Sequence, residues 1–197
     1  MKRNIKRVAA LMALCLAFVS VGAAAEEIEA SGLTNPAPSQ AFTAFDRIEV
    51  RPITMGEPYA GQKANDAALV SLQANLDQRL QAWLPERNQR AVQGAPRVLL
   101  VEPRVDKIRF IGGGARFWAG AMAGSSRVLM KARITDQATG ALIAEPEFYQ
   151  HAAGMAGAWS MGGADKAMLA RTTTLLSDYL KANDPAAVGG PTGQVVD

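Results

Sequence analysis

The segment AWSMG, residues 158–162, imitates the turn that presents a nucleophilic serine in hydrolases, with Ser160 at its centre. Such a turn joins a buried strand to a helix, and the preceding residues HAAGMAG lack the pattern of a buried strand. The single histidine, His151, precedes the serine rather than following it, although other triads use a different chain order. A chance match is therefore favoured, and a serine hydrolase using Ser160 and His151 is the less favoured hypothesis.

Glu145 and Glu147 flank Pro146 and would point to the same strand face, as a carboxylate pair for acid–base work or a weak calcium contact would. Proline favours an edge strand and no third carboxylate is nearby in sequence, so we expect solvated edge residues. After residue 25 the chain has one histidine and no cysteine, which cannot build a typical zinc site. The sequence therefore predicts no metal, no cofactor and no enzymatic activity.

The segment 112–124 (GGGARFWAGAMAG) has five glycines around apolar side chains and a single charge. It lacks the Lys and Ser/Thr of a phosphate loop, and Phe117 stands where a dinucleotide turn needs its third glycine. Gly120 and Gly124 stand four apart, as in close helix packing. The segment could insert into a membrane surface, dock a partner or fold back onto the sheet. Since exposed apolar patches mark interaction surfaces, we name as the candidate contact residues Arg116, Phe117, Trp118 and Met122.

The charges of the chain point to export. Of 197 residues, 49% are hydrophobic and 20% are charged, which fits one globular domain. Four basic residues precede an uncharged stretch that ends in three alanines, as in a secretory signal peptide, and we predict cleavage after Ala25. Removal of residues 1–25 changes the net charge from +3 to −1, with 17 basic and 18 acidic side chains. A nucleic-acid partner is therefore not expected.

Cys15 raises the alternative that the leader is a lipoprotein signal. Bacterial lipoprotein signals end at a cysteine after small residues, but bulky Leu14 precedes Cys15 and the apolar run continues beyond it. The leader is also just long enough to remain as a membrane anchor. Each of these fates exports the domain, so we expect a periplasmic or outer-membrane-associated protein.

The pattern along the chain predicts one α+β domain over residues 45–183, preceded by a flexible linker over 26–44 and followed by a disordered tail over 184–197. Alternating residues predict a strand over 45–53, and apolar steps of three and four predict a helix from Asn65 to Trp83, capped by Asn65 or Asp66. Residues 97–101 and 105–111 have strand patterns, with a bulge, bend or edge expected at Pro103 between them.

A hairpin and a second helix complete the predicted domain. The segment DQATG, residues 136–140, predicts a tight reversal between the strands 130–134 and 141–150. Residues 165–183 predict the closing helix. The order β-α-β-β-β-α favours a mostly antiparallel sheet with two helices packed on one face, in which only the first connection can be a parallel crossover.

The segment 112–150 resembles a family of bacterial envelope proteins called domain of unknown function 4410. There, a Gly-rich stretch with Arg and aromatic residues leads into a long strand, an Asp-x-x-Thr-Gly reversal and a return strand. The residues that match this pattern are Arg116, Trp118, Gly120, Gly124, Asp136, Thr139 and Gly140. Domain of unknown function 3313, a lipoprotein family, is the alternative. The resemblance implies an exported α+β domain and carries over no catalytic residue.

These observations together predict a non-enzymatic interaction or accessory module of the cell envelope, with an envelope protein, a membrane surface or a second copy of the chain as partner. A periplasmic protein that binds a small ligand between sheet and helices is the alternative.

Overall fold

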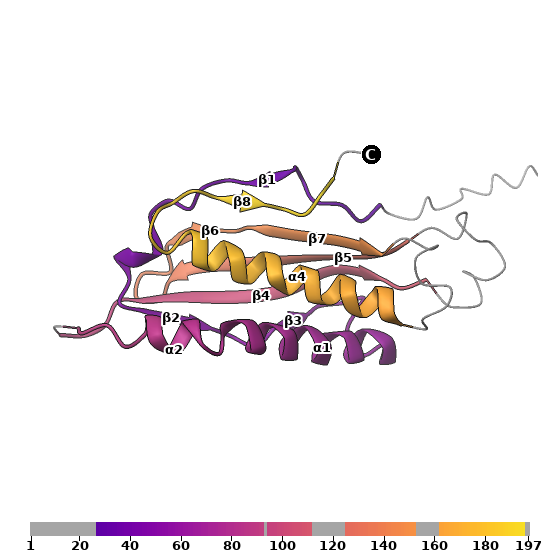
Figure 1. Ribbon diagram of the computed structural model, residues 1–197, viewed down its shortest axis with the longest axis horizontal. Coiled ribbons are helices and arrows are strands. Elements are labelled where there is room, and N and C mark those ends of the chain that lie inside the picture. The colour runs from indigo at the N-terminus through magenta and orange to yellow at the C-terminus, as the bar shows by residue number, and fades with distance from the viewer. Residues whose placement is uncertain (1–26, 93, 112–124, 153–161, 196–197) are drawn as a thin grey trace, which may run out of the picture.

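The computed structural model describes residues 27–92, 94–111, 125–152 and 162–195. Its elements follow the chain as β1 (Thr34–Asn35), the 3₁₀ turn η1 (Phe42–Ala44), β2 (Arg47–Val50), β3 (Thr54–Met55), α1 (Lys63–Leu80), α2 (Trp83–Arg87), β4 (Val98–Arg109), β5 (Ser126–Asp136), β6 (Leu142–Ala144), β7 (Glu147–Ala152), α4 (Gly163–Ala182) and β8 (Gly190–Pro191). The helices α1 and α4 lie side by side over the sheet (Figure 1).

The main sheet is mixed and has the order β2-β4-β5-β6, with β3 also paired to β4 and β7 also paired to β5. All pairs formed by β5 are antiparallel, whereas β2 and β3 run parallel to β4. The α+β class is confirmed, and the parallel pairs arise because the chain crosses from β3 to β4 through α1, as the first connection allowed. The sheet is therefore less uniformly antiparallel than predicted.

The core lies between the helices and the inward face of the sheet. Leu72 and Leu76 of α1 and Leu176 of α4 are almost fully buried and belong to one cluster with Val128 and Met130 of β5. This inward face of β5 alternates with outward residues, as the period of a strand requires. The apolar face that was predicted for the first helix from steps of three and four is thus the face that is buried.

The start of α1 differs from the prediction. The helix begins at Lys63, and Gln62 precedes it without a side-chain cap. Asn65 is buried in the first turn, where its Nδ2 donates a hydrogen bond to the carbonyl of Tyr59 at 2.9 Å. Asn65 therefore holds the loop before the helix instead of capping it, and Asp66 also lies inside the helix.

Residues 98–109 form one continuous strand where two were predicted. Pro103 lies opposite Ala132 of β5, and on the other side of β4 it falls between the residues paired to β2 and those paired to β3. The missing N–H of proline costs no ladder hydrogen bond at such a break. The register shift comes after it, between Val105 and Lys107.

The predicted reversal over 136–140 is present. Asp136 Oδ1 accepts a hydrogen bond from the backbone N–H of Ala138 at 3.0 Å, and Gly140 has a φ of +71°, which favours glycine. The return strand is divided by Pro146 into β6 and β7, and the carbonyl of Pro146 accepts from the N–H of Ala132 between them.

The prediction of a linker and a tail is corrected for the described residues 27–44 and 184–195, because both segments pack on the domain. β1 pairs antiparallel with β8 (Figure 1). Phe42 is 0% exposed, because its side chain belongs to the main core. Sparse hydrophobic periodicity concealed these segments in the sequence.

Candidate functional site

Most of the predicted site residues lie outside the described residues. This applies to the contact residues Arg116, Phe117, Trp118 and Met122, to Ser160, and to the predicted cleavage site at Ala25. Of the predicted Ser160–His151 pair, only His151 is described. The hydrolase hypothesis and the contact surface therefore stay predictions.

The described strands nevertheless fix where the segment 112–124 leaves the fold. It follows the end of β4 and precedes the start of β5, and the segment 153–161 follows the end of β7. Arg109 lies opposite Arg127, and Arg127 lies opposite His151. Both segments therefore join the described fold at one end of the sheet, which we call the β4–β5–β7 end (Figure 1).

The first described residues of the chain dock at the same end. Ile28 is 3% exposed and packs on Leu129 and Tyr149, on the sheet face that is turned away from the helices. Arg127 Nη1 lies 3.1 Å from Glu27 Oε1 and donates to the carbonyl of Ile28 at 3.3 Å. Glu27 thus forms an ion pair with this arginine while its own side chain stays 67% exposed.

The polar groups at this end are largely committed to structure. Ser126 Oγ accepts a hydrogen bond from the N–H of Ile111 at 3.1 Å. Arg171 of α4 donates to Gln150 Oε1 at 2.7 Å and to the carbonyl of His151 at 2.9 Å. The His151 ring lies beside Tyr149, with 6.0 Å between centroids. These contacts tie α4 to the outer strand.

The predicted carboxylate pair is not present as a pair of solvated edge residues. Glu145 is exposed, but Glu147 is largely covered, because the N–H of Ser31 donates to it at 2.7 Å and Lys131 Nζ lies 3.0 Å away. Burial alone would raise the pKa of Glu147, but these contacts outweigh burial and hold it below the ordinary value. Glu147 therefore acts as a structural anion beneath the N-terminal segment.

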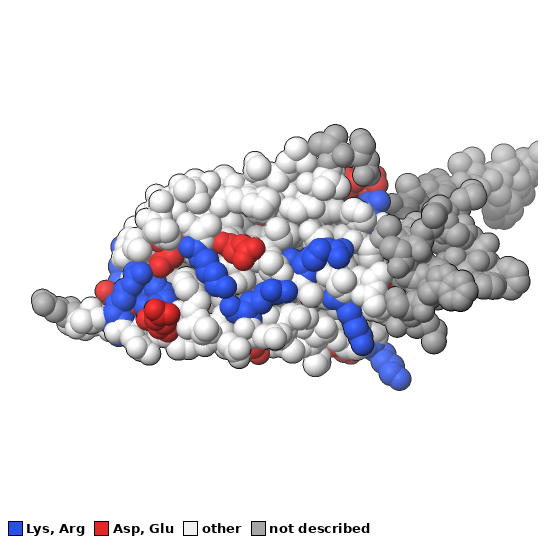
Figure 2. Space-filling view, in the orientation of Figure 1, with Lys and Arg blue, Asp and Glu red and all other residues white. Residues whose placement is uncertain are grey.

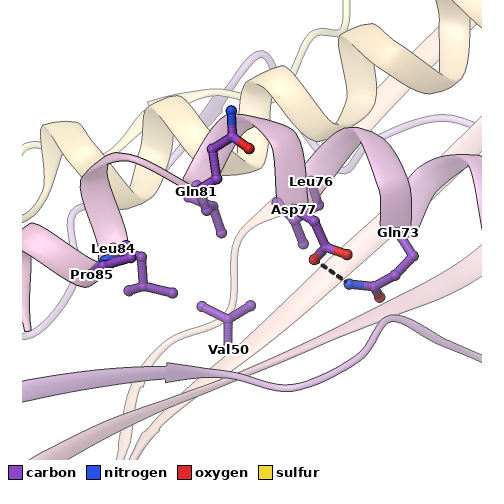
Figure 3. Close-up of a pocket in the computed structure, with 8 residues that line it drawn as sticks. Val50, Gln73, Leu76, Asp77, Gln81, Leu84 and Pro85 are labelled. Atoms are coloured by element: carbon purple, nitrogen blue, oxygen red, sulfur yellow. Dashed lines mark hydrogen bonds between the residues drawn. The ribbon is translucent and has the colours of Figure 1, made fainter.

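A groove of about 190 Å³ lies where β2 meets α1 and α2 (Figure 3). Val50, Leu76 and Leu84 line it, and two of its polar side chains, Gln73 and Asp77, make structural bonds. Gln73 donates to Asp77 Oδ1 at 2.7 Å and accepts from the N–H of Ile53 at 2.8 Å. Pockets for small ligands are usually about 300 to 1,000 Å³, so this groove gives the ligand-binding alternative no support.

The exposed helical face carries Lys and Arg side chains along α1 and α4, interspersed with acidic ones (Figure 2). Some of them are structural, since Lys181 Nζ donates to the carbonyl of Arg79 at 3.1 Å and Arg79 donates to the carbonyl of Ala170 at 3.3 Å. Within the described ranges, no three His, Cys, Asp or Glu side chains gather as a metal site. No helix in those ranges is long and apolar enough to cross a bilayer.

No family model matches the chain, and no curated protein matches it either. The chain is similar to the PelC dodecamer from Paraburkholderia phytofirmans, at 17% identity over 71% of this chain and 91% of the other, with a TM-score of 0.36. A candidate lipoprotein from Caulobacter crescentus CB15 aligns at 16% identity over 70% and 89%, with a TM-score of 0.37. A hypothetical protein from Chlamydia trachomatis aligns at 8% identity over 69% and 98%, with a TM-score of 0.35. These values assign neither a family nor a function, and the resemblance to domain of unknown function 4410 stays a prediction.

Proposed function

We propose that the protein is an exported, non-enzymatic interaction module of the cell envelope, with its contact surface at the β4–β5–β7 end. The observation that carries this proposal is the convergence there of the strand ends that flank the segments 112–124 and 153–161. Both segments are rich in glycine, alanine, methionine and tryptophan, with Arg116 as the single charge. Apolar and aromatic residues on a polar domain are typical of a contact surface.

The leader supports the envelope location. Residues 8–25 are uncharged and follow four basic residues, and Glu27 binds Arg127 two residues after the predicted cleavage site. Intact mass of the protein recovered from an expressing bacterium tests this part. A soluble product that begins at Glu26 supports a free periplasmic module, whereas a heavier, membrane-bound product that begins at Cys15 supports a lipoprotein.

The contact surface is tested by the double variant Phe117→Ser/Trp118→Ser. Its control is Val70→Ser, which removes an apolar side chain that is 71% exposed on α1, outside the proposed surface. Cross-linking in intact cells and sedimentation of the purified protein report envelope partners and self-association. We expect the double variant to lose these contacts and the control to keep them. Equal behaviour of both variants would remove segment 112–124 from the proposal.

The non-enzymatic part is tested separately with Ser160→Ala. We expect no esterase or peptidase activity in the unaltered protein. An activity that disappears in this variant and in His151→Ala would favour the hydrolase hypothesis instead.

A further inference from the structure

The outer face of the sheet, which is turned away from α1 and α4, carries a cross-strand row of basic side chains. Ile108 and Val128 point into the core, so alternation places their neighbours Arg109 and Arg127 on the outer face. His151 of β7 continues the row, opposite Arg127. Directly opposed residues in a sheet have Cβ atoms about 4.5 to 5.5 Å apart, so the three side chains start from neighbouring positions on this face.

The two arginines of the row are not satisfied equally by their described neighbours. Arg109 and Arg127 lie directly opposite each other. Two like charges in this arrangement destabilise a sheet. Arg127 has Glu27 at 3.1 Å and Glu29 at 3.8 Å. In the described part of the chain, by contrast, no hydrogen bond or ion pair reaches the guanidinium of Arg109, and its Nε is buried without a partner. This end of the row therefore has unused donors.

The contact with Glu27 shows what kind of group the row accepts. The Glu27 side chain is 67% exposed, whereas that of Arg127 is 20% exposed. The carboxylate therefore reaches Arg127 from the solvent side. Exposed ion pairs of this kind are weak, and a ligand with more oxygens can displace one. The neighbouring Arg109 offers the additional donors.

We propose that Arg109, Arg127 and His151 bind the phosphoryl group of an anionic ligand. Two guanidinium groups and an imidazole N–H can donate several hydrogen bonds to one tetrahedral group of oxygens, and charge-assisted bonds of this kind are strong. Glu27 and Glu29 act as internal competitors for the same donors. The site contains no residue of the segment 112–124. Its test is therefore independent of the test of the proposed contact surface.

The phosphoryl group can belong to a soluble compound or to a phospholipid headgroup, and two binding experiments with the protein that begins at Glu26 separate these sources. One titrates inorganic phosphate by calorimetry at low ionic strength, and the other sediments the protein with vesicles of phosphatidylglycerol and phosphatidylcholine or of phosphatidylcholine alone. Arg109→Gln is the test variant. Arg133→Gln is its control, because Arg133 of β5 is exposed on the same face of the sheet, opposite Glu102, and its substitution removes the same charge.

We expect Arg109→Gln to weaken binding about tenfold and Arg133→Gln to change it less than about twofold. Dependence on Arg109 in the vesicle experiment assigns a lipid headgroup, and dependence in the phosphate experiment alone assigns a soluble ligand. An unaltered protein that binds neither probe overturns the proposal. Equal losses in both variants overturn it too, because they would show diffuse charge attraction.

A second variant guards against a folding defect in Arg109→Gln. The double change Glu27→Gln/Glu29→Gln removes the internal carboxylates and leaves the row intact. The affinity for the probe that the unaltered protein binds, phosphate or vesicles, should therefore increase by about threefold to tenfold. Unchanged or weaker binding in this variant contradicts the assignment of these carboxylates as competitors and of the row as the site.

Discussion

A single buried arginine joins three distant parts of the chain. Arg87 at the end of α2 has a side chain that is 1% exposed, and its Nε donates to Asp184 Oδ1 at 2.8 Å. Its Nη2 donates to the carbonyls of Phe42 and Phe45 at 2.8 and 2.7 Å. A pocket of about 240 Å³ beside this pair is lined by Arg87 and Asp184, whose charges neutralise each other. We therefore assign Arg87 a structural role.

Arg87→Met should lower the free energy of unfolding by about 3 to 5 kcal/mol, because Asp184 would remain buried without its main partner. The matched control is Arg51→Met, which breaks the exposed pair with Glu49 and should cost less than about 1 kcal/mol. Denaturant unfolding monitored by circular dichroism measures both. Losses of similar size would mean that the Arg87–Asp184 pair is no more important than a surface pair.

At the scale of elements, asparagine side chains close both outer edges of the sheet. Asn88 accepts from the N–H of Ile48 at 2.8 Å and donates to its carbonyl at 2.9 Å, on the free side of β2. Asn35 makes the same two bonds with Glu147 of β7, at 2.7 and 2.8 Å. An amide side chain thus replaces a neighbouring strand at each edge, which protects the sheet against pairing with another chain.

Asn88→Ala should destabilise the fold by about 1 to 3 kcal/mol and raise self-association, since two backbone groups of Ile48 would lose their partner. Asn75→Ala is the control, because Asn75 donates only to Ser71 within α1. Denaturant unfolding and sedimentation velocity report the two effects. If both variants are equally stable and equally monomeric, the Asn88 amide does not protect the β2 edge.

The hairpin between β5 and β6 carries a pH-sensitive contact. Arg97 donates to Asp136 Oδ2 at 3.0 Å and holds the pKa of this carboxyl below its ordinary value of 3.8. A lowered pKa in the folded state stabilises the protein above the unfolded pKa, and this contribution is lost as the pH falls through the folded pKa.

Asp136→Asn should therefore be less stable than the unaltered protein at neutral pH, and the difference should shrink below about pH 4. The turn itself is retained, because the asparagine side chain can still accept from Ala138. Thermal unfolding across pH 2 to 7 measures the difference, with the exposed Glu145→Gln as control. A difference that stays constant down to pH 2 would show that the Arg97 contact does not depend on this charge.

The elements that sequence predicts are those with a strong local signal. The apolar steps of α1 and α4 and the turn residues Asp136 and Gly140 specify structure within a few positions. The parallel pairing of β2 with β4 and the Asn88 and Asn35 bonds depend on residues 40 or more positions apart, so no local pattern reveals them. The same holds for the row of Arg109, Arg127 and His151, because only the strand register makes these residues neighbours.

At the scale of the whole molecule, the described segments 27–35 and 189–195 form one layer along the outer strand β7. β1 pairs with β8, the N–H of Tyr149 donates to the carbonyl of Thr192 at 2.7 Å, and Thr192 Oγ1 donates to the carbonyl of Gly32 at 2.6 Å. This layer places Glu27 on the row of basic side chains. The first described segment of the chain is thus part of the domain surface that we propose to bind anions.

If residues 27–35 and 189–195 form one cooperative unit, a single substitution should increase hydrogen exchange in both segments. Asn35→Ala removes two bonds to Glu147, and we expect backbone amides in residues 27–35 and 189–195 to exchange together, about 5 to 150 times faster, while the amides of β4 and β5 stay protected. Thr34→Ala, at an exposed neighbouring position, is the control and should change little. Hydrogen exchange read by mass spectrometry resolves both segments. Faster exchange in residues 27–35 alone would mean that β8 keeps its position on β7 without β1. Residues 27–35, and with them Glu27, could then leave the row of Arg109, Arg127 and His151 independently of β8.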